Sequence, residues 1–258
     1  MKEGYVALLD VLGFADLAAG DHTGGRMNRY LESVRETMEG QEIDYVVFSD
    51  SIVLNAKGEG PEPLAAVAEA CSRLLRALLG DGIALRGAIA FGDFVRQSFG
   101  ESVFVAGRAV IDAYRFEKAQ DWIGVMLAPS AVARVPTLRE RCNLRVAAGS
   151  ERADLKAIEE RYPWPAFIQP CDEIPFHVSS PSEPSVFDGF AIVPTSGVLE
   201  AAEISASIRA AMAKLGWLRA IAPTPGAQRK YQLTQNWLDQ VLKLWGHVAY
   251  MKEQTARG

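Results

Sequence analysis

Two aspartates lie at the ends of short hydrophobic runs, 40 positions apart in the sequence. Asp10 follows the run Tyr5–Leu9, and Asp50 follows the run Tyr45–Phe48. A carboxylate at the end of a buried strand loses hydration, so it needs a compensating partner. Two converging carboxylates are most simply compensated by hard divalent cations, which prefer oxygen ligands. Each residue alone could instead have a local role, Asp50 in a turn and Asp10 as the N-cap of the next helix.

The hydrophobic pattern around these residues predicts alternating strands and helices. Continuous apolar runs indicate strands, and apolar side chains at helical spacing indicate helices. We expect strands at residues 4–10, 43–56 (two strands), 84–93, 122–127 and 186–193, and helices at about 25–38, 62–79, 106–119, 199–215 and 227–252. The order β-α-β-β-α-β-α-β contains the split β-α-β unit of ferredoxin-like sheets, which predicts an α+β fold. Residues 150–185 are expected to form an elaborated loop that carries one strand.

Length and composition are those of an ordinary globular protein. The chain has 258 residues, 49% hydrophobic and 23% charged, which allows one large domain or one domain with an appendage. No apolar run approaches the roughly 20 residues of a membrane span, and the first strand begins too early to leave room for a signal peptide. The three cysteines show no C-x-x-C spacing, which favours neither a disulfide framework nor a zinc site. We therefore expect a cytoplasmic protein with no membrane partner.

The net charge and the histidine content restrict the classes of ligand that the protein is expected to bind. The net charge is −5 and the basic residues are scattered. This pattern disfavours binding to a nucleic-acid polymer but is compatible with a single nucleotide held through metal. The three histidines show no helical i, i+4 pairing, so a histidine-based metal or acid–base centre is not expected.

Four segments in the first half of the chain form an ordered series of motifs. They are Leu9-Asp10-Val11-Leu12-Gly13-Phe14, Phe48-Ser49-Asp50, Leu85-Arg86-Gly87-Ala88-Ile89-Ala90-Phe91-Gly92, and the helix that runs from Gly107 to Glu117. In order and spacing they resemble the Asp-x-x-Gly-Phe element, the second metal aspartate, the Arg-x-Gly-Ile-x-x-Gly strand and the Gly-x-x-Val-Asn-x-Ala-x-Arg-Leu-Glu helix of class III nucleotidyl cyclases. The following strand and Pro129-Ser130 also match, so the resemblance covers residues 4–135, about half of the chain.

The resemblance implies two-metal cyclisation of a nucleoside triphosphate, a lyase reaction. Asp10, Asp50 and the main-chain carbonyl of Val11 would hold two Mg²⁺ or Mn²⁺ ions. Backbone N–H groups of the Gly13-Phe14 turn would bind the β- and γ-phosphates, and Arg115 would neutralise charge that develops on the α-phosphoryl group. The catalytic domain would span residues 1–195, and residues 196–258 would form a helical C-terminal extension packed on the same domain or dimer.

The chain departs from this family at several positions. The family asparagine that orients the ribose aligns with Ile111, and Asp112 or Arg108 could replace it from a neighbouring helical position. The family's phosphate-binding lysine cannot be placed, because the later part of the chain does not align. Arg115 could instead be a solvated helix residue that pairs with Glu117 or Asp112.

The residues at the base-reading positions suggest which nucleotide is used. Purine cyclases read the base with polar pairs, Lys and Asp or Glu and Cys, at positions that here hold Val46 and Phe104. Strand alternation places Val46, Phe48 and Asp50 on one face. A pocket that lacks polar side chains to recognise the base, and that also contains additional Phe side chains, should reject purines. This pattern looks like the pyrimidine cyclases of bacterial Pycsar antiphage systems, which make cyclic UMP or cyclic CMP. We favour UTP because most of that family is thought to use it, although these residues do not decide between UTP and CTP.

The resemblance also implies partners. A homodimer would carry two shared sites, each with Asp10 and Asp50 from one chain and Arg115 from the other. A separately encoded effector would be linked through the cyclic nucleotide rather than by direct binding. Three alternatives stay open: a purine cyclase with unfamiliar base contacts, a non-catalytic nucleotide-binding or dimerisation module, and a relative of diguanylate cyclases or polymerase palms. The last is disfavoured because the chain has no Gly-Gly-Asp/Glu-Glu-Phe element.

Overall fold

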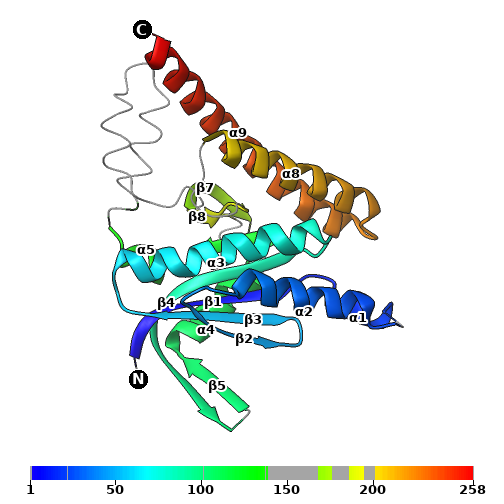
Figure 1. Ribbon diagram of the computed structural model, residues 1–258, viewed down its shortest axis with the longest axis vertical. Helices are drawn as coiled ribbons and strands as arrows, with labels where there is room; N and C mark the ends of the chain where they lie inside the picture. The colour runs from blue at the N-terminus through cyan, green and yellow to red at the C-terminus, as the bar shows by residue number, and fades with distance from the viewer. Residues whose placement is uncertain are drawn as a thin grey trace.

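The computed structural model describes residues 2–21, 23–100, 102–136, 138, 168–175, 186–194 and 201–257. Within these residues eight strands form one sheet in the order β2-β3-β1-β4-β6-β8-β7, with β5 paired to β4 (Figure 1). The strands are β1 (Lys2–Val11), β2 (Asp44–Phe48), β3 (Ser51–Lys57), β4 (Leu85–Phe99), β5 (Ser102–Gly107), β6 (Gly124–Leu127), β7 (Ile168–Pro175) and β8 (Val186–Ile192). The helices are α1 (Phe14–Ala19), α2 (Gly25–Met38), α3 (Pro61–Gly80), α4 (Arg108–Ala119), α5 (Pro129–Ala133), α8 (Ala201–Ile221) and α9 (Pro225–Arg257).

The first four strands form the predicted ferredoxin-like core. β1 lies between β3 and β4 and is antiparallel to both, and β2 is antiparallel to β3. The connection from β1 to β2 passes through α1 and α2, and the connection from β3 to β4 passes through α3, so each crossover skips one strand. This arrangement confirms the α+β class and the split β-α-β unit. β6 then extends the sheet in parallel with β4.

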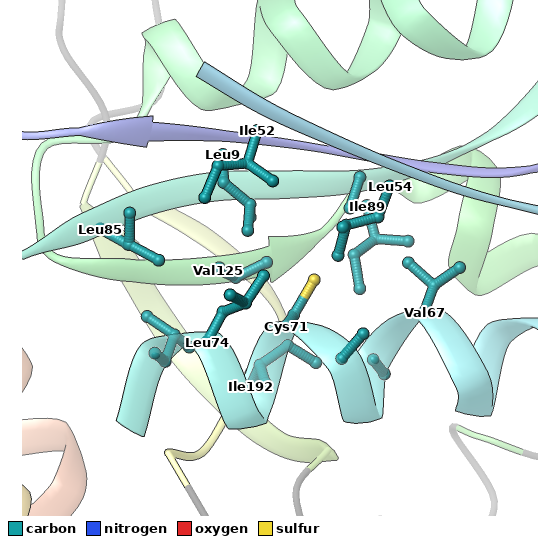
Figure 2. Close-up of a cluster of buried hydrophobic side chains, with 14 of the residues drawn as sticks. Leu9, Ile52, Leu54, Val67, Cys71, Leu74, Leu85, Ile89, Val125 and Ile192 are labelled. Carbon is teal, nitrogen blue, oxygen red and sulfur yellow. The ribbon is translucent and has the colours of Figure 1, made fainter. Parts of the chain in front are cut away.

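Different helices cover the two faces of the sheet. Tyr5, Ala7 and Leu9 of β1 pack in the large core together with α3, whereas Val6 packs with a residue of α4. Figure 2 shows side chains of α3 meeting side chains from β1, β3, β4, β6 and β8. Because alternate side chains of a strand point to opposite faces, Asp10 lies on the same face as Val6, toward α4.

The helix α3 forms because its sequence supplies both a start signal and an apolar stripe. Pro61 occupies the first turn, where a missing N–H costs little. Leu64, Val67, Cys71 and Leu74 recur at helical spacing and are all fully buried. This stripe closes the sheet face opposite α4, and that face contains the largest core cluster.

The C-terminal helices α8 and α9 form an antiparallel pair that packs on the β6–β8 side of the sheet (Figure 1). Trp237 of α9 makes an edge contact with Trp122, with ring centroids 5.3 Å apart. Thr234 donates its hydroxyl to the carbonyl of Ile123 at 2.7 Å and accepts the Ile123 N–H at 3.1 Å. The apolar stripe predicted on α9 is therefore buried at Trp237, while the side chains of residues 244–250 lie outside the described residues.

The sequence predicted only a short link between the strand that ends at residue 93 and the helix that begins near residue 106, and this prediction is wrong. β4 continues to Phe99 and pairs with β5 from Phe94 opposite Gly107 to Phe99 opposite Ser102. The two strands form an arm that projects from the sheet (Figure 1). Backbone pairing holds this arm together while many of its side chains are exposed, so the arm has no regular buried face to reveal it in the sequence.

The predicted alternation from Val46 to Asp50 also fails at its last step. Phe48 pairs with Ser51, and Ser49 and Asp50 form a two-residue turn in which Ser49 has φ 55°. Two-residue hairpin turns require positive φ, and the strand pattern therefore ends at Phe48. Asp50 does not share the strand face of Val46.

Several sequence expectations fall partly outside the described residues. β7 is a strand within the segment 150–185, and residues 150–167 and 176–185 are not described. The predicted boundary at residues 195 and 196 also lies there, so the division into two parts stays a prediction. No helix among the described residues is long and apolar enough to cross a membrane.

Candidate active site at the end of β1

The three residues predicted to hold metal occupy neighbouring positions at one end of the sheet. Asp10 is the penultimate residue of β1 and lies opposite Ser51 of β3. The Val11 N–H donates to the main-chain carbonyl of Asp50 at 2.8 Å. The Asp10 side chain is 14% exposed and Asp50 is half-buried. Two carboxyl-bearing residues are thus joined by the backbone where solvent can reach them.

Tyr30 of α2 lies near enough to Asp50 to feel its charge. Burial, together with the negative charge of Asp50, raises the pKa of Tyr30 to about 12. The Tyr30 hydroxyl is buried and has no hydrogen-bond partner among the described residues. Phe14 packs edge-on against the Tyr30 ring at 6.0 Å. The turn that carries Asp50 therefore lies near a neutral phenol in an apolar setting.

The loop after β1 exposes its backbone. Gly13 has φ 73°, a conformation that L side chains rarely adopt. Its carbonyl accepts the N–H of Leu17 at 3.0 Å, and the Leu12 N–H donates to Ala84 at 2.9 Å. Within the described part of the chain, a Cβ at Gly13 would meet no atom within 4 Å. The predicted phosphate-binding turn at Gly13 and Phe14 is open on its outer side.

Arg86, for which the sequence predicted no role, contacts Asp10. Its Nη2 lies 3.4 Å from Asp10 Oδ2 and 2.6 Å from Glu117 Oε1. Its Nε donates to the same Glu117 oxygen at 2.8 Å, and its Nη1 donates to the Gln120 carbonyl at 3.3 Å. The Gln120 side chain is itself fixed by hydrogen bonds to Gly87 and Trp122. Arg86 is therefore held by α4 and the segment after it, and it in turn orients Asp10.

A signal for this pair was present in the sequence. Ala109, Ala113 and Glu117 are spaced by four residues, and all three are buried on the face of α4 that meets the sheet. A carboxylate on such a stripe needs a cation partner, and Arg86 is a charged residue inside a buried strand. Burial raises the pKa of Glu117, and the Arg86 guanidinium opposes that shift.

A second cation also faces Asp10. The Lys118 Nζ lies 3.8 Å from Asp10 Oδ1 and 3.5 Å from Glu117 Oε2. Its side chain is partly exposed, so this contact is solvated and weaker than that of Arg86. The Asp10 carboxylate therefore interacts with two cationic side chains, those of Arg86 and Lys118.

The donor set fits hard divalent cations in one particular way. Among the described residues, no group of three or more His, Cys, Asp or Glu side chains could hold a metal ion. Asp10, Asp50 and the Val11 carbonyl offer only oxygen, which suits Mg²⁺ or Mn²⁺. Two carboxylates carry little charge for two such ions, and Mg²⁺ commonly completes its shell with substrate phosphates. The residues therefore fit a metal site that is completed by ligand phosphates rather than by protein side chains alone.

The predicted base-reading residues lie on different parts of the chain. Val46 is half-buried in β2, and Phe48 is 79% exposed at the hairpin end. Phe104 is 51% exposed on the arm, opposite Gln97. Arg86 is the residue of β4 that lies opposite Asp10, and Gln97 lies 11 positions farther along the same strand. The strand pairing of one chain does not bring Phe104 beside its own Asp10.

The predicted residues of α4 face solvent to different degrees. Arg115 is exposed and forms no ion pair with any described residue, and Glu117 is engaged by Arg86 instead. Asp112 is half-buried, and Ile111 is 59% exposed at the position of the family asparagine. Arg115 is thus solvated, as the alternative role predicted, but the ion pair with Glu117 or Asp112 is not observed.

Three solved structures illustrate what the backbone resembles. No protein-family model and no curated protein sequence matches this chain. The guanylyl cyclase Cya2 covers 52% of this chain and 78% of its own at 13% identity, with a TM-score of 0.42. The dimeric guanylyl cyclase domain of the RhoGC fusion protein from the aquatic fungus Blastocladiella emersonii covers 53% and 85% at 12% identity, with a TM-score of 0.40. An adenylate cyclase from Trypanosoma brucei covers 74% and 90% at 10% identity, with a TM-score of 0.47. At these values the likeness carries no functional argument, so function has to be argued from the residues.

Proposed function

We propose that this protein is a nucleotidyl cyclase that converts UTP to 3′,5′-cyclic UMP and pyrophosphate. The observation that carries the proposal is the neighbouring placement of Asp10, Val11 and Asp50 at one end of the sheet. The motif resemblance to class III cyclases gives these residues their roles. The cofactor would be Mg²⁺ or Mn²⁺, two ions per site.

In this reaction the ribose 3′ oxygen bonds to the α-phosphorus, its proton is lost, and the bond to the leaving pyrophosphate breaks. Asp10, Asp50 and the Val11 carbonyl would hold the metal ions. When bound, these ions supply charge neutralisation and a lower pKa for the 3′ hydroxyl. Arg86 and Lys118 are positioning residues, because their contacts restrain the Asp10 carboxylate.

The phosphate chain would be bound by the backbone of the Gly13–Phe14 turn, which is open to solvent. Arg115 would neutralise charge on the α-phosphoryl group. Its exposure and its lack of an ion-pair partner among the described residues leave the guanidinium available for that role. Asp112 is the nearest polar candidate for contact with the ribose, because Ile111 cannot donate or accept a hydrogen bond.

The proposed preference for a pyrimidine depends on Val46, Phe48 and Phe104. None of them can form side-chain hydrogen bonds with a purine, and a site without polar readers discriminates by size. The choice of UTP over CTP follows the resemblance to pyrimidine cyclases. The same resemblance supports a role in antiphage defence within the cytoplasm, with an effector that responds to the cyclic nucleotide.

The proposed assembly is a homodimer with shared sites. Large apolar side chains are exposed on β2, on the arm and on α4, namely Phe48, Phe99, Val103, Phe104, Ile111 and Tyr114. Exposed apolar groups of this kind mark interaction surfaces. A partner chain would supply the Phe104 that the strand pairing of one chain does not bring to its own Asp10, and, following the resemblance to class III cyclases, it would also supply Arg115.

One observation favours a second candidate, a non-catalytic nucleotide-binding module. Arg86 and Lys118 already neutralise Asp10, and Ile111 replaces the ribose-orienting asparagine. A protein that only bound nucleotide could keep such an arrangement.

Product analysis separates the two candidates. Purified protein is incubated with UTP and Mn²⁺, and cyclic UMP and pyrophosphate are measured by mass spectrometry and an enzymatic assay. We expect equal amounts of both products and a loss of at least about 100-fold in Asp50→Ala. Asp44→Ala is the matched control on the same hairpin, and it should keep full activity. Nucleotide binding without product would favour the binding module.

A further inference from the structure

A cavity of about 450 Å³ lies between α2, the C-terminal half of α3 and α8. It lies on the α3 side of the sheet, where Figure 1 shows α8 beside the end of α3. The Asp10 side chain faces α4 on the opposite side. None of the residues that line the cavity belongs to the candidate active site. This cavity is therefore separate from the residues of the proposed cyclase activity.

Three cations face this cavity. Arg73 and Arg76 come from α3, three residues apart and so on one side of the helix, and Lys214 comes from α8. No acidic residue is among the described residues that line it. The chain as a whole carries a net charge of −5, so the cluster does not reflect a generally basic surface.

The cations of the cavity are only partly neutralised. Arg73 pairs with Glu69 of the same helix at 2.6 Å. Arg76 has no hydrogen bond or ion pair with any described residue, and the Lys214 Nζ lies 4.7 Å from the centre of the Trp217 ring. Neither arginine lies in the last turn of α3, so attraction to the helix C-terminus does not account for them. Positive charge in a hollow without acids favours an anionic ligand.

The rest of the lining suits an organic body. Small and apolar residues, Ala77, Leu79, Gly80 and Ala210 among them, form part of the wall. The cavity volume lies in the range of pockets that bind small molecules. Ser207 adds a hydroxyl that can donate to or accept from a ligand.

We propose that this cavity binds a mononucleotide-sized phosphate ester. Arg76 and Lys214 would bind the phosphate, since guanidinium groups match phosphate oxygens in pairs and an ammonium group adds a point charge. The base and sugar would lie against the apolar wall. Such a ligand would bridge α3 and α8, and it would stabilise the contact between the core and the C-terminal helices.

Calorimetric titration of the full-length protein tests this proposal. The probes are UMP, AMP, cyclic UMP and pyrophosphate, at physiological ionic strength and with EDTA to keep metal from the candidate active site. We expect at least one of the three mononucleotides to bind. Arg76→Gln and Lys214→Gln should each weaken that binding about tenfold, as expected for a lost charge-assisted contact. Arg209→Gln, on an exposed part of α8 outside the lining, and Asp50→Ala should bind like the unaltered protein.

Four outcomes would overturn the proposal. They are no binding of any mononucleotide, unchanged affinity in both cavity variants, loss of binding in Asp50→Ala, and pyrophosphate binding as tight as that of the best mononucleotide. Thermal unfolding of each variant shows whether it is folded. Arg76→Lys, which keeps the charge, should recover part of the affinity, and a purely structural defect would not respond in this way.

Discussion

At the scale of single residues, the geometry of the candidate site depends on Arg86. Its guanidinium joins the buried Glu117 of α4 to Asp10 at the end of β1. The spacing of Ala109, Ala113 and Glu117 signals a buried carboxylate on α4, but only the fold shows that Arg86, 31 positions away, is its partner. Asp10 and Asp50, by contrast, could be predicted as neighbours, since each one lies at the end of an apolar run.

Arg86→Gln should destabilise the fold by about 3 kcal/mol at neutral pH, because removing Arg86 leaves the Glu117 carboxylate buried without its partner. The pKa of Glu117 is raised by burial, so its ionisation costs stability as the pH rises through that pKa, and loss of Arg86 increases the cost. The defect should therefore shrink as the pH falls through the raised pKa of Glu117, where the carboxyl takes up a proton. Urea denaturation at neutral pH and at a pH below that pKa measures this difference.

The control for this change is Arg29→Gln, an exposed cation on α2, which should alter stability by less than about 0.5 kcal/mol. A variant at Arg86 as stable as the unaltered protein at both pH values would show that the buried pair does not support the site.

Gly87 sets how closely β4 approaches β1 next to Asp10. A Cβ at this position would meet the Leu8 carbonyl at 2.6 Å and the Leu9 Cα at 3.1 Å. Gly87→Ala should therefore destabilise the protein by about 2 kcal/mol, the cost of overpacking, and thermal unfolding measures it. Gly226→Ala is the matched control, since a Cβ there would meet no described atom within 4 Å, and it should be neutral or slightly stabilising. Equal effects of the two changes would contradict the close approach.

At the scale of elements, the predictability of each segment follows from how it is stabilised. α3 and β1 were predicted to within about two residues at each end, because a helical stripe or a continuous apolar run is buried against the core. The arm formed by the end of β4 and by β5 was missed, because it is held by backbone pairing and its side chains have no common buried face. The turn at Ser49 and Asp50 matches the alternative role predicted for Asp50, whereas the positive φ of Ser49 is set by the hairpin register.

The arm is expected to act in dimer formation rather than in folding. Phe104 is about half exposed, so Phe104→Glu should leave the unfolding midpoint almost unchanged and weaken self-association by at least about tenfold. Sedimentation velocity over a range of concentrations measures the association. Ile221→Glu, an equally exposed apolar position at the end of α8, should leave it unaltered. Identical sedimentation of both variants and the unaltered protein would argue against an interface at the arm.

At the scale of the whole molecule, we expect each active site to be formed by residues from two chains. Asp10 and Asp50 lie at one end of β1, while Arg115 is exposed on α4 and Phe104 lies on the projecting arm. The pairing of the first four strands was predictable from their order, but whether two chains share a site depends on a surface that no sequence pattern specifies.

Mixing two inactive variants tests this sharing. Asp50→Ala and Arg115→Ala are each expected to be inactive as homodimers. If they are denatured and refolded together, random pairing makes half of the dimers mixed, and each mixed dimer has one intact site, so activity should return to about a quarter of normal. Cyclic nucleotide formation per chain measures it. Activity no higher than the sum of the separate variants would contradict a shared site.

The most direct test of the central claim is a competition among substrates. The protein is incubated with Mn²⁺ and an equimolar mixture of ATP, GTP, CTP and UTP, and all cyclic products are quantified by mass spectrometry. Cyclic UMP should be the main product, in an amount matched by pyrophosphate, and it should be absent in Asp50→Ala. Cyclic AMP or cyclic GMP as the main product, or no cyclic nucleotide at all, would contradict it.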